Sequence, residues 1–426
     1  MRQRNFRLLW IGETISSGGD AMAVVGMPLL AVTVLHASTV AVAAITASAY
    51  LPWLIIGLPG GAWVDRLPCR RLMITCDIMS FTLYASLPAS AWAGELTIAQ
   101  VIAVALAAGS VSVLFTTAYR VLLPSLVGPD DLIEGNAKLQ GSAAAAAIGG
   151  RAASGIAAEA VGAATALLFN AASFVVSAAC LLAIRPAASP PPAASAPPVT
   201  SPPPAARPGT TLRAEIAEGT RFIRRDPYLR PLTLYGCAAN LTYSGSTALV
   251  VLLLVRVIGL GPAAAGLLLA VSGFGGIGGA LAARRLARRA GSARALLLCA
   301  AAGGLSGLLI PLAGPGPRAA FFAAGATTVA AAIAVSNIVI GSFRQAYCPP
   351  ALLGRVTATM SLLVRAGIPV GALAAGAIAA AIGVRGALWV LMTCFALSAA
   401  LLATPAIRSA RDLPRQPAAA LSRAGR

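Results

Sequence analysis

Residues Gly60–Arg71 read GGAWVDRLPCRR and place one carboxylate and three arginines between two apolar runs. The first run spans about residues 39–63 and the second about residues 72–93. Roughly 20 apolar residues in a helix cross a hydrocarbon core of about 30 Å, so each run is long enough to span a membrane. A short charged segment between two such runs is typical of a loop at a membrane surface.

This alternation of long apolar runs and short connections covers most of the 426 residues. Hydrophobic residues make up 58% of the chain and charged residues 11%, against about 25% charged residues in a soluble domain. Alanine, glycine, leucine and valine dominate the runs, which suits close packing of membrane helices through small residues. No segment alternates apolar and polar residues as the strands of a membrane barrel do. We therefore predict an all-α polytopic membrane protein.

Twelve transmembrane helices are predicted, at residues 8–35, 39–63, 72–93, 97–122, 140–160, 163–184, 231–256, 262–283, 294–313, 318–342, 357–381 and 384–406. The first run is too long for a signal-peptide core and carries Glu13 and Asp20, so it is not expected to be cleaved. Basic residues then collect in the connections on the side of the N-terminus. The opposite connections hold only Arg256, Arg318 and Arg385.

This asymmetry follows the positive-inside rule. The formal net charge of +19 is therefore interpreted as membrane topology, and nucleic acid is not an expected partner. The chain is expected in the cytoplasmic membrane with both termini in the cytoplasm. The seven cysteines are scattered without metal-ligand spacing, and the single histidine, His36, lies at a helix end. No metal, cofactor or enzyme activity is expected.

The predicted spans divide into two bundles of six helices. The first bundle covers residues 1–185, a linker and an amphipathic helix follow at 186–230, the second bundle covers 231–406, and a cytoplasmic tail covers 407–426. Residues 186–209 read PAASPPPAASAPPVTSPPPAARPG, which indicates an extended spacer. The next segment, TLRAEIAEGTRFIRRDPYLR, has helical periodicity and a basic face typical of a helix at the membrane surface.

Two segments of the first bundle are similar to segments of the second. PDDLIEGNAKL from Pro129 is similar to PPALLGRVTAT from Pro349, and NFRLLWIGE from Asn5 is similar to YLRPLTLYGC from Tyr228. The two offsets, 220 and 223 residues, are nearly equal. They indicate a parallel internal repeat, the plan of transporters whose substrate site lies between two halves near the middle of the membrane.

Gly61-x-x-x-Asp65-Arg66 followed by Arg70-Arg71 resembles the loop signature of the major facilitator superfamily. NFRLLWIGETISSGGDA at the start, the loop after the second span, and EGNAKLQ before a Gly-Arg pair in the fifth span resemble its drug and macrolide efflux branch. That branch includes siderophore exporters. The resemblance implies two pseudo-repeated six-helix bundles, the major facilitator fold, and transport of a small molecule by alternating access.

The resemblance further implies that this loop latches the two halves on the cytoplasmic side, so that Asp65 and Arg66 stabilise the outward-open state. The latch residues would be Gly61, Asp65, Arg66, Arg70, Arg71 and Asp77. Gly61 allows a neighbouring helix to approach closely, and the Asp65 carboxylate can accept hydrogen bonds from a helix N-terminus or an arginine. Simple positive-inside anchoring is the alternative and accounts for Arg70 and Arg71, but it leaves Asp65 unexplained.

Charged residues inside the spans are candidate functional residues, because each costs about 2.5–3.5 kcal/mol to insert at a helix centre. Asp20, after Gly18-Gly19, is the proposed proton-coupling carboxylate, with a structural ion pair as its alternative. Glu13 is a second candidate for proton coupling, and the alternative is that its side chain only extends to the membrane surface. Arg151 is the expected partner of a carboxylate or of an anionic substrate group, or is structural, and Arg365 is expected to face the cavity.

The sequence therefore predicts a secondary active transporter that exports small amphiphilic compounds, namely drugs, macrolides or secondary metabolites, by proton-coupled alternating access. An importer or facilitator of the same fold, or a siderophore-specific exporter, is the alternative. The expected partners are a small-molecule substrate, protons and the lipid bilayer, and the chain is expected to be a monomer. No ATP-binding motif is present, so a gradient is expected to supply the energy.

Overall fold

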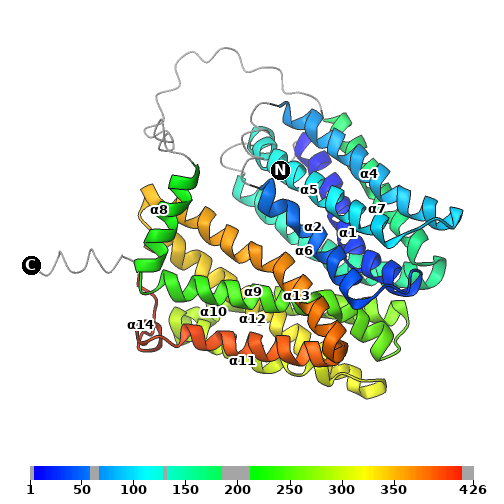
Figure 1. Ribbon diagram of the computed structural model, residues 1–426. Helices are drawn as coiled ribbons and strands as arrows, with labels where there is room; N and C mark the ends of the chain where they lie inside the picture. The colour runs from blue at the N-terminus through cyan, green and yellow to red at the C-terminus, as the bar shows by residue number, and fades with distance from the viewer. Residues whose placement is uncertain (1–3, 58–66, 128–131, 185–211, 415–426) are drawn as a thin grey trace, which may run out of the picture.

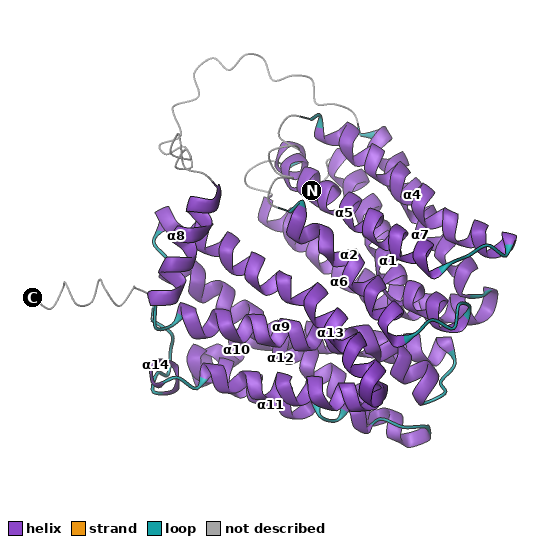
Figure 2. Cartoon of the chain, in the orientation of Figure 1, coloured by secondary structure: helices purple, strands orange, loops and turns teal. Residues whose placement is uncertain are grey.

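The computed structural model describes residues 4–57, 67–127, 132–184 and 212–414. Across these residues the chain forms helices and connections only, as Figure 2 shows, and no strand. The helices of the first half are α1 (Arg4–Thr33), α2 (Thr39–Ile55), α4 (Cys69–Ala93), α5 (Ile98–Leu126), α6 (Leu132–Val161) and α7 (Ala163–Ala183).

The second half begins with the short helix α8 (Leu212–Arg225) and continues with five long helices. These are α9 (Leu229–Leu252), extended by the π-helical turn η2 (Leu253–Val257), and then α10 (Pro262–Ala290), α11 (Ser292–Gly307), α12 (Ala319–Tyr347) and α13 (Pro350–Ser398). The one-turn helix α14 (Pro405–Arg408) ends this part of the chain. Figure 1 shows the two halves as two bundles of helices placed beside each other.

The described helices make twelve passages, as the sequence predicts. Nine of the described helices are long and apolar enough to cross a membrane. Of these, α13 makes two passages, because Gly383 has φ 78° and ψ 161°, which breaks the helix at that residue. The remaining two passages are α2, an apolar helix of 17 residues, and α6, whose 30 residues include Arg151 and Glu159. The predicted all-α fold is confirmed.

The basic residues gather at one end of the bundle. The helix ends that carry Arg70, Arg71, Arg288 and Arg289 lie at this end, which we call the basic end. Among the described connections at the opposite end, here called the far end, the arginines are Arg256, Arg318 and Arg385. The predicted charge asymmetry is therefore present in the fold. That the basic end faces the cytoplasm stays a prediction.

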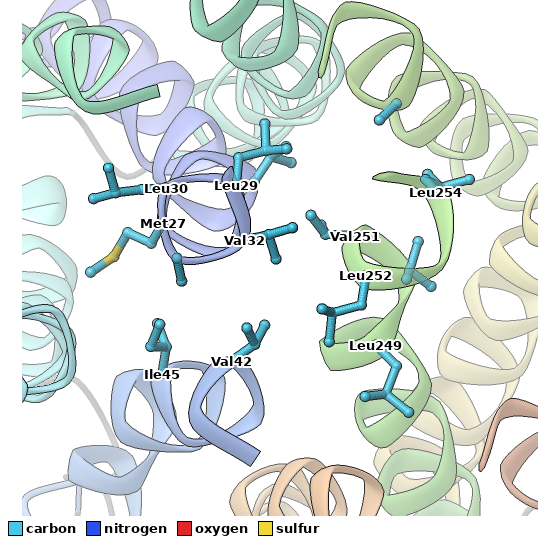
Figure 3. Packing of buried hydrophobic residues seen from close by; sticks show 14 of the residues in the cluster. Met27, Leu29, Leu30, Val32, Val42, Ile45, Leu249, Val251, Leu252 and Leu254 are labelled. Atoms are coloured by element: carbon cyan, nitrogen blue, oxygen red, sulfur yellow. The ribbon is translucent and has the colours of Figure 1, made fainter. Parts of the chain in front are cut away.

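Among the described residues, the buried hydrophobic clusters that both halves share lie toward the far end and the middle of the bundle. There, Leu29 and Val42 of the first half lie in one cluster with Leu252 and Leu254 of the second half, as Figure 3 shows. At the basic end, Phe6 and its neighbours form a cluster built from the first half alone. The second half has a separate cluster there, which includes Tyr347. The halves are therefore packed together at the far end and packed on themselves at the basic end.

Two polar contacts join the halves at the far end. The Arg256 Nη1 atom donates a hydrogen bond to the Ala37 carbonyl oxygen at 2.6 Å, and its Nη2 donates to the Val32 carbonyl oxygen at 3.3 Å. In return, the Ala263 amide at the start of α10 donates to the Glu159 Oε2 atom at 2.9 Å. Each half thus supplies a charged side chain to a helix end of the other half.

Helix α8 packs against α9 and α13 at the basic end. Ile223 is buried, and Glu218 forms an ion pair with Arg355 at the start of α13. The corner between α8 and α9 is fixed by Asp226. Its Oδ1 atom accepts from the amides of Tyr228 and Leu229 at 2.9 and 2.8 Å, and its Oδ2 accepts from the Tyr347 hydroxyl at 2.7 Å.

Candidate functional site

A cavity of about 280 Å³ lies within the first half and is lined by α1, α2, α4, α5 and α7. Three carboxylates line it: Glu13 and Asp20 from α1, and Asp77 from α4. The part of the chain that the structure describes holds no cluster of three or more acidic, histidine or cysteine side chains with metal-binding geometry. The three acids therefore share the wall of one cavity.

Asp20 is positioned by the two glycines before it. A Cβ atom on Gly19 would collide with the side chains of Ser173 and Asn170 on α7, so α1 and α7 approach closely at this point. On the neighbouring face, a Cβ on Gly150 of α6 would meet the Gly18 carbonyl oxygen. Small residues at these crossings hold α1 against two helices, and Asp20 then points into the cavity from near the middle of α1.

Asp77 lies deeper than the other two acids. Its side chain is 1% exposed, Ser177 of α7 lies within hydrogen-bonding reach of it, and its Oδ2 atom has no hydrogen-bond partner among the described residues. From the sequence, Asp77 was grouped with the loop between the second and third spans. The structure instead places it two turns inside α4 and in the same cavity as Glu13 and Asp20.

The rest of the cavity wall combines serine and threonine hydroxyls with apolar and aromatic side chains, among them the rings of Tyr50, Trp53, Tyr84, Phe115 and Phe174. The second half reaches this wall through one charged side chain. The Arg365 guanidinium of α13 lies over the Trp53 ring of α2, 4.7 Å from the ring centroid, in a cation–π contact. Arg365 itself is not among the residues that line this cavity, and its role in transport stays a prediction.

Arg151 does not line the cavity of the three carboxylates. It lines a second cavity, between the halves, and Val24 is a wall residue of both. Within the described residues Arg151 forms no ion pair, so the expected pairing with a carboxylate of α1 is absent in this conformation. The structure thus brings Glu13, Asp20 and Asp77 together and keeps Arg151 apart from them.

The residues of the predicted latch fall in two groups. Gly61, Asp65 and Arg66 lie outside the described residues. Arg70 donates from Nε to the Leu181 carbonyl oxygen and from Nη2 to the Leu182 carbonyl oxygen, both at 2.8 Å. These carbonyls end α7, so the guanidinium ties α4 to α7 inside the first half. Arg71 is exposed at the basic end.

Two functional candidates were not found from the sequence. The sequence does not single out Glu159, and it shows Arg256 only as a charge in a connection on the side opposite the N-terminus. Their contacts join residues more than 100 positions apart. The only local signal is Gly261-Pro262, the start pattern of a helix whose free amides attract a carboxylate.

The comparisons with known proteins agree with this architecture. Residues 9–367 match the family model of the Major Facilitator Superfamily, and the chain belongs to this superfamily. No curated protein matches the sequence. Similar solved structures include the nucleoside transporter NupG, as a D323A mutant, with a TM-score of 0.75, 11% identity, and coverage of 94% of this chain and 98% of that one.

Two further solved structures are similar at the level of the fold. A bacterial homologue of the iron transporter ferroportin, in an inward-facing state, has a TM-score of 0.72 and 16% identity, with coverage of 94% and 98%. A bacterial homologue of the human lysosomal transporter Spinster, inward-facing and unoccupied, has a TM-score of 0.68 and 13% identity, with coverage of 93% and 95%. Identities this low show the fold alone, and it is the family match over residues 9–367 that makes the protein a transporter of the major facilitator type.

Proposed function

We propose that the chain is a proton-coupled secondary active transporter that exports small amphiphilic compounds through the cytoplasmic membrane as a monomer. The observation that carries the proposal is the cavity of the first half, in which Glu13, Asp20 and Asp77 share a wall with five aromatic rings. An apolar and aromatic wall binds the body of an amphiphile. Three acids in one cavity repel one another when ionised, which favours the uptake of protons there.

The arrangement of the halves supports alternating access. The halves are joined at the far end and pack separately at the basic end, so a rocking motion about the middle would close one end and open the other. With the basic end in the cytoplasm, this conformation faces inward and receives its substrate from the cell. Proton binding to Asp20 would remove a charge from the cavity and change the relative free energy of the two packings.

The energy available to such a cycle is sufficient to drive it. One elementary charge moving through 100 mV is worth about 2.3 kcal/mol, which changes a two-state equilibrium by roughly fiftyfold. An importer or facilitator has the same fold, and the direction of transport is therefore decided by experiment. In the latch proposal, Asp65 and Arg66 would join the halves at the basic end in the opposite, outward-open state.

The test is the accumulation of macrolides, dyes and siderophore-like compounds in a host that lacks its own pumps. Wild type is compared with Asp20→Asn, with the empty vector, and with Glu95→Gln, an exposed acid at the far end outside the cavity. We expect wild type and Glu95→Gln to lower the accumulation of at least one compound, and Asp20→Asn or a protonophore to abolish the effect. Raised accumulation would indicate import, and no difference from vector for any compound would reject general efflux.

A further inference from the structure

A second cavity, of about 120 Å³, lies between the two halves. Its walls come from α1 and α6 of the first half and from α9, α10 and α12 of the second. Most of the lining is aliphatic or aromatic, such as Val250, Leu269 and Phe322. Its polar groups are the Arg151 guanidinium, the Tyr243 hydroxyl, and the side chains of Ser246, Thr247 and Ser272. No carboxylate lines it.

No acidic side chain in the described part of the chain neutralises the Arg151 guanidinium. Across the described ranges, Arg151 forms neither an ion pair nor a side-chain hydrogen bond, and its walls are too apolar to replace water around a charge. A charged group inside a membrane protein is costly and normally pairs with an opposite charge. The other described mid-membrane arginine, Arg365, differs because its charge rests on the Trp53 ring.

Of the hydroxyl groups that line this cavity with Arg151, that of Tyr243 also indicates an anion. Ser246, Thr247 and Ser272 donate their protons to carbonyl oxygens of their own helices, so they add no charge and need no ligand. The Tyr243 hydroxyl has no hydrogen-bond partner in the described chain and is a free donor on this wall. A cavity with a guanidinium, a free phenolic donor and no acid favours an anion over a cation.

We propose that this cavity binds the anionic head group, a carboxylate, sulfonate or phosphate, of an organic anion that the protein transports. A volume of about 120 Å³ is below the roughly 300–1,000 Å³ of a site for a whole drug-sized ligand, so the cavity takes one group of the ligand. The apolar body lies toward Val24, which the larger cavity shares. Arg151 gives bidentate recognition to such a group.

This assignment makes the transported compounds amphiphilic organic acids and rests on the proposed function for its role in transport. Binding of the anion would also change how the two halves pack. Arg151 belongs to the first half and Tyr243 to the second, so an anion held by both stabilises one packing of the halves. The proposed proton-binding acids and the proposed anion site lie in different cavities.

The test measures binding of radiolabelled benzoate to the full chain in lipid nanodiscs, without any ion gradient. We expect saturable binding by wild type that benzenesulfonate displaces and that benzylamine and benzyl alcohol do not. Arg151→Gln should weaken benzoate binding about tenfold or more, because a charge-assisted hydrogen bond is lost. Arg151→Lys, which keeps the charge, should lose less, and Arg318→Gln, a far-end arginine outside both cavities, should match wild type.

Loss of binding in Arg365→Gln with full binding in Arg151→Gln would overturn the proposal, as would the absence of saturable benzoate binding to wild type. A protection experiment uses the unaltered protein in case Arg151→Gln does not fold. Benzoate should slow the modification of Arg151 by phenylglyoxal, located by mass spectrometry, and equal rates with and without benzoate would reject the site.

Benzoate binding without export would reject the transport proposal alone, and export without benzoate binding would reject this site alone.

Discussion

Single residues decide how closely α1 is packed, and Gly19 is the clearest case. Replacing it by alanine puts a methyl group into the side chains of Ser173 and Asn170, which belong to the tightly packed α7. Overpacking of this kind costs about 1–3 kcal/mol. We therefore expect Gly19→Ala to lower the midpoint of thermal unfolding in detergent by several degrees and to reduce transport, because Asp20 moves with the backbone.

Gly149 provides the matched control for this prediction. It lies in α6, and a Cβ atom on it would meet no atom within 4 Å. Gly149→Ala should be neutral or slightly stabilising, since alanine has the higher helix propensity by about 1 kcal/mol. If Gly19→Ala and Gly149→Ala unfold at the same temperature, the close approach of α1 and α7 at Gly19 is not a determinant of stability.

At the scale of elements, the corner between α8 and α9 depends on one carboxylate. Asp226 caps the first amides of α9 and also accepts from the Tyr347 hydroxyl at the end of α12. We expect Asp226→Ala to lower the free energy of unfolding by about 1–2 kcal/mol, the usual value of an N-cap. Tyr347→Phe should cost about 1 kcal/mol, and the pair should cost less than the sum because the two changes share a hydrogen bond.

Thermal unfolding of the two single variants and the double variant in detergent measures these values. Glu95→Ala is the control, because Glu95 lies exposed in the connection between α4 and α5. A double variant that loses the full sum would show that Asp226 and Tyr347 act independently. An unchanged midpoint for Asp226→Ala would show that α8 is held by its other contacts, such as the ion pair of Glu218 with Arg355.

The elements themselves were largely predictable, and the contacts between them were not. Hydropathy finds most of the passages, because a helix that crosses lipid needs a long apolar surface, whereas α2 is short and α6 carries charged residues. The turn at Gly383 and the helix after the linker also have local signals. By contrast, the grouping of Asp77 with Glu13 and Asp20 depends on how α4 is rotated against α1, and apolar runs rich in alanine and glycine do not encode which face turns inward.

At the scale of the whole molecule, two charged side chains join the halves at the far end, each by hydrogen bonds to backbone groups of the other half. Arg256 of the second half donates to the Val32 carbonyl oxygen at the end of α1, where the helix dipole is negative, and to the Ala37 carbonyl oxygen in the connection that follows. Glu159 of the first half accepts from the Ala263 amide at the start of α10, where the helix dipole is positive. An outward-open state must break both contacts, because they cross between the halves. Each is a charge-assisted bond worth about 1.5–3 kcal/mol.

We therefore expect Glu159→Gln and Arg256→Gln each to raise the fraction of molecules open at the far end by about tenfold or more. The measurement is the distance between nitroxide labels at Glu95→Cys and Arg318→Cys, two exposed far-end positions in opposite halves, in a chain whose native cysteines are replaced by serine. A population at longer distance should appear in each variant and grow when the two substitutions are combined.

Arg385 separates this effect from the simple loss of a far-end charge. Its Nη2 atom donates to the Ala313 carbonyl oxygen at 2.7 Å, a contact that stays inside the second half. Arg385→Gln removes the same charge and the same kind of hydrogen bond, but it breaks nothing between the halves, so its distance distribution should match that of the parent chain. A shift in Arg385→Gln equal to that in Arg256→Gln would mean that far-end charge, and not the contact across the halves, sets the equilibrium. Unchanged distances in both Glu159→Gln and Arg256→Gln would mean that the shared apolar core alone keeps the far end closed.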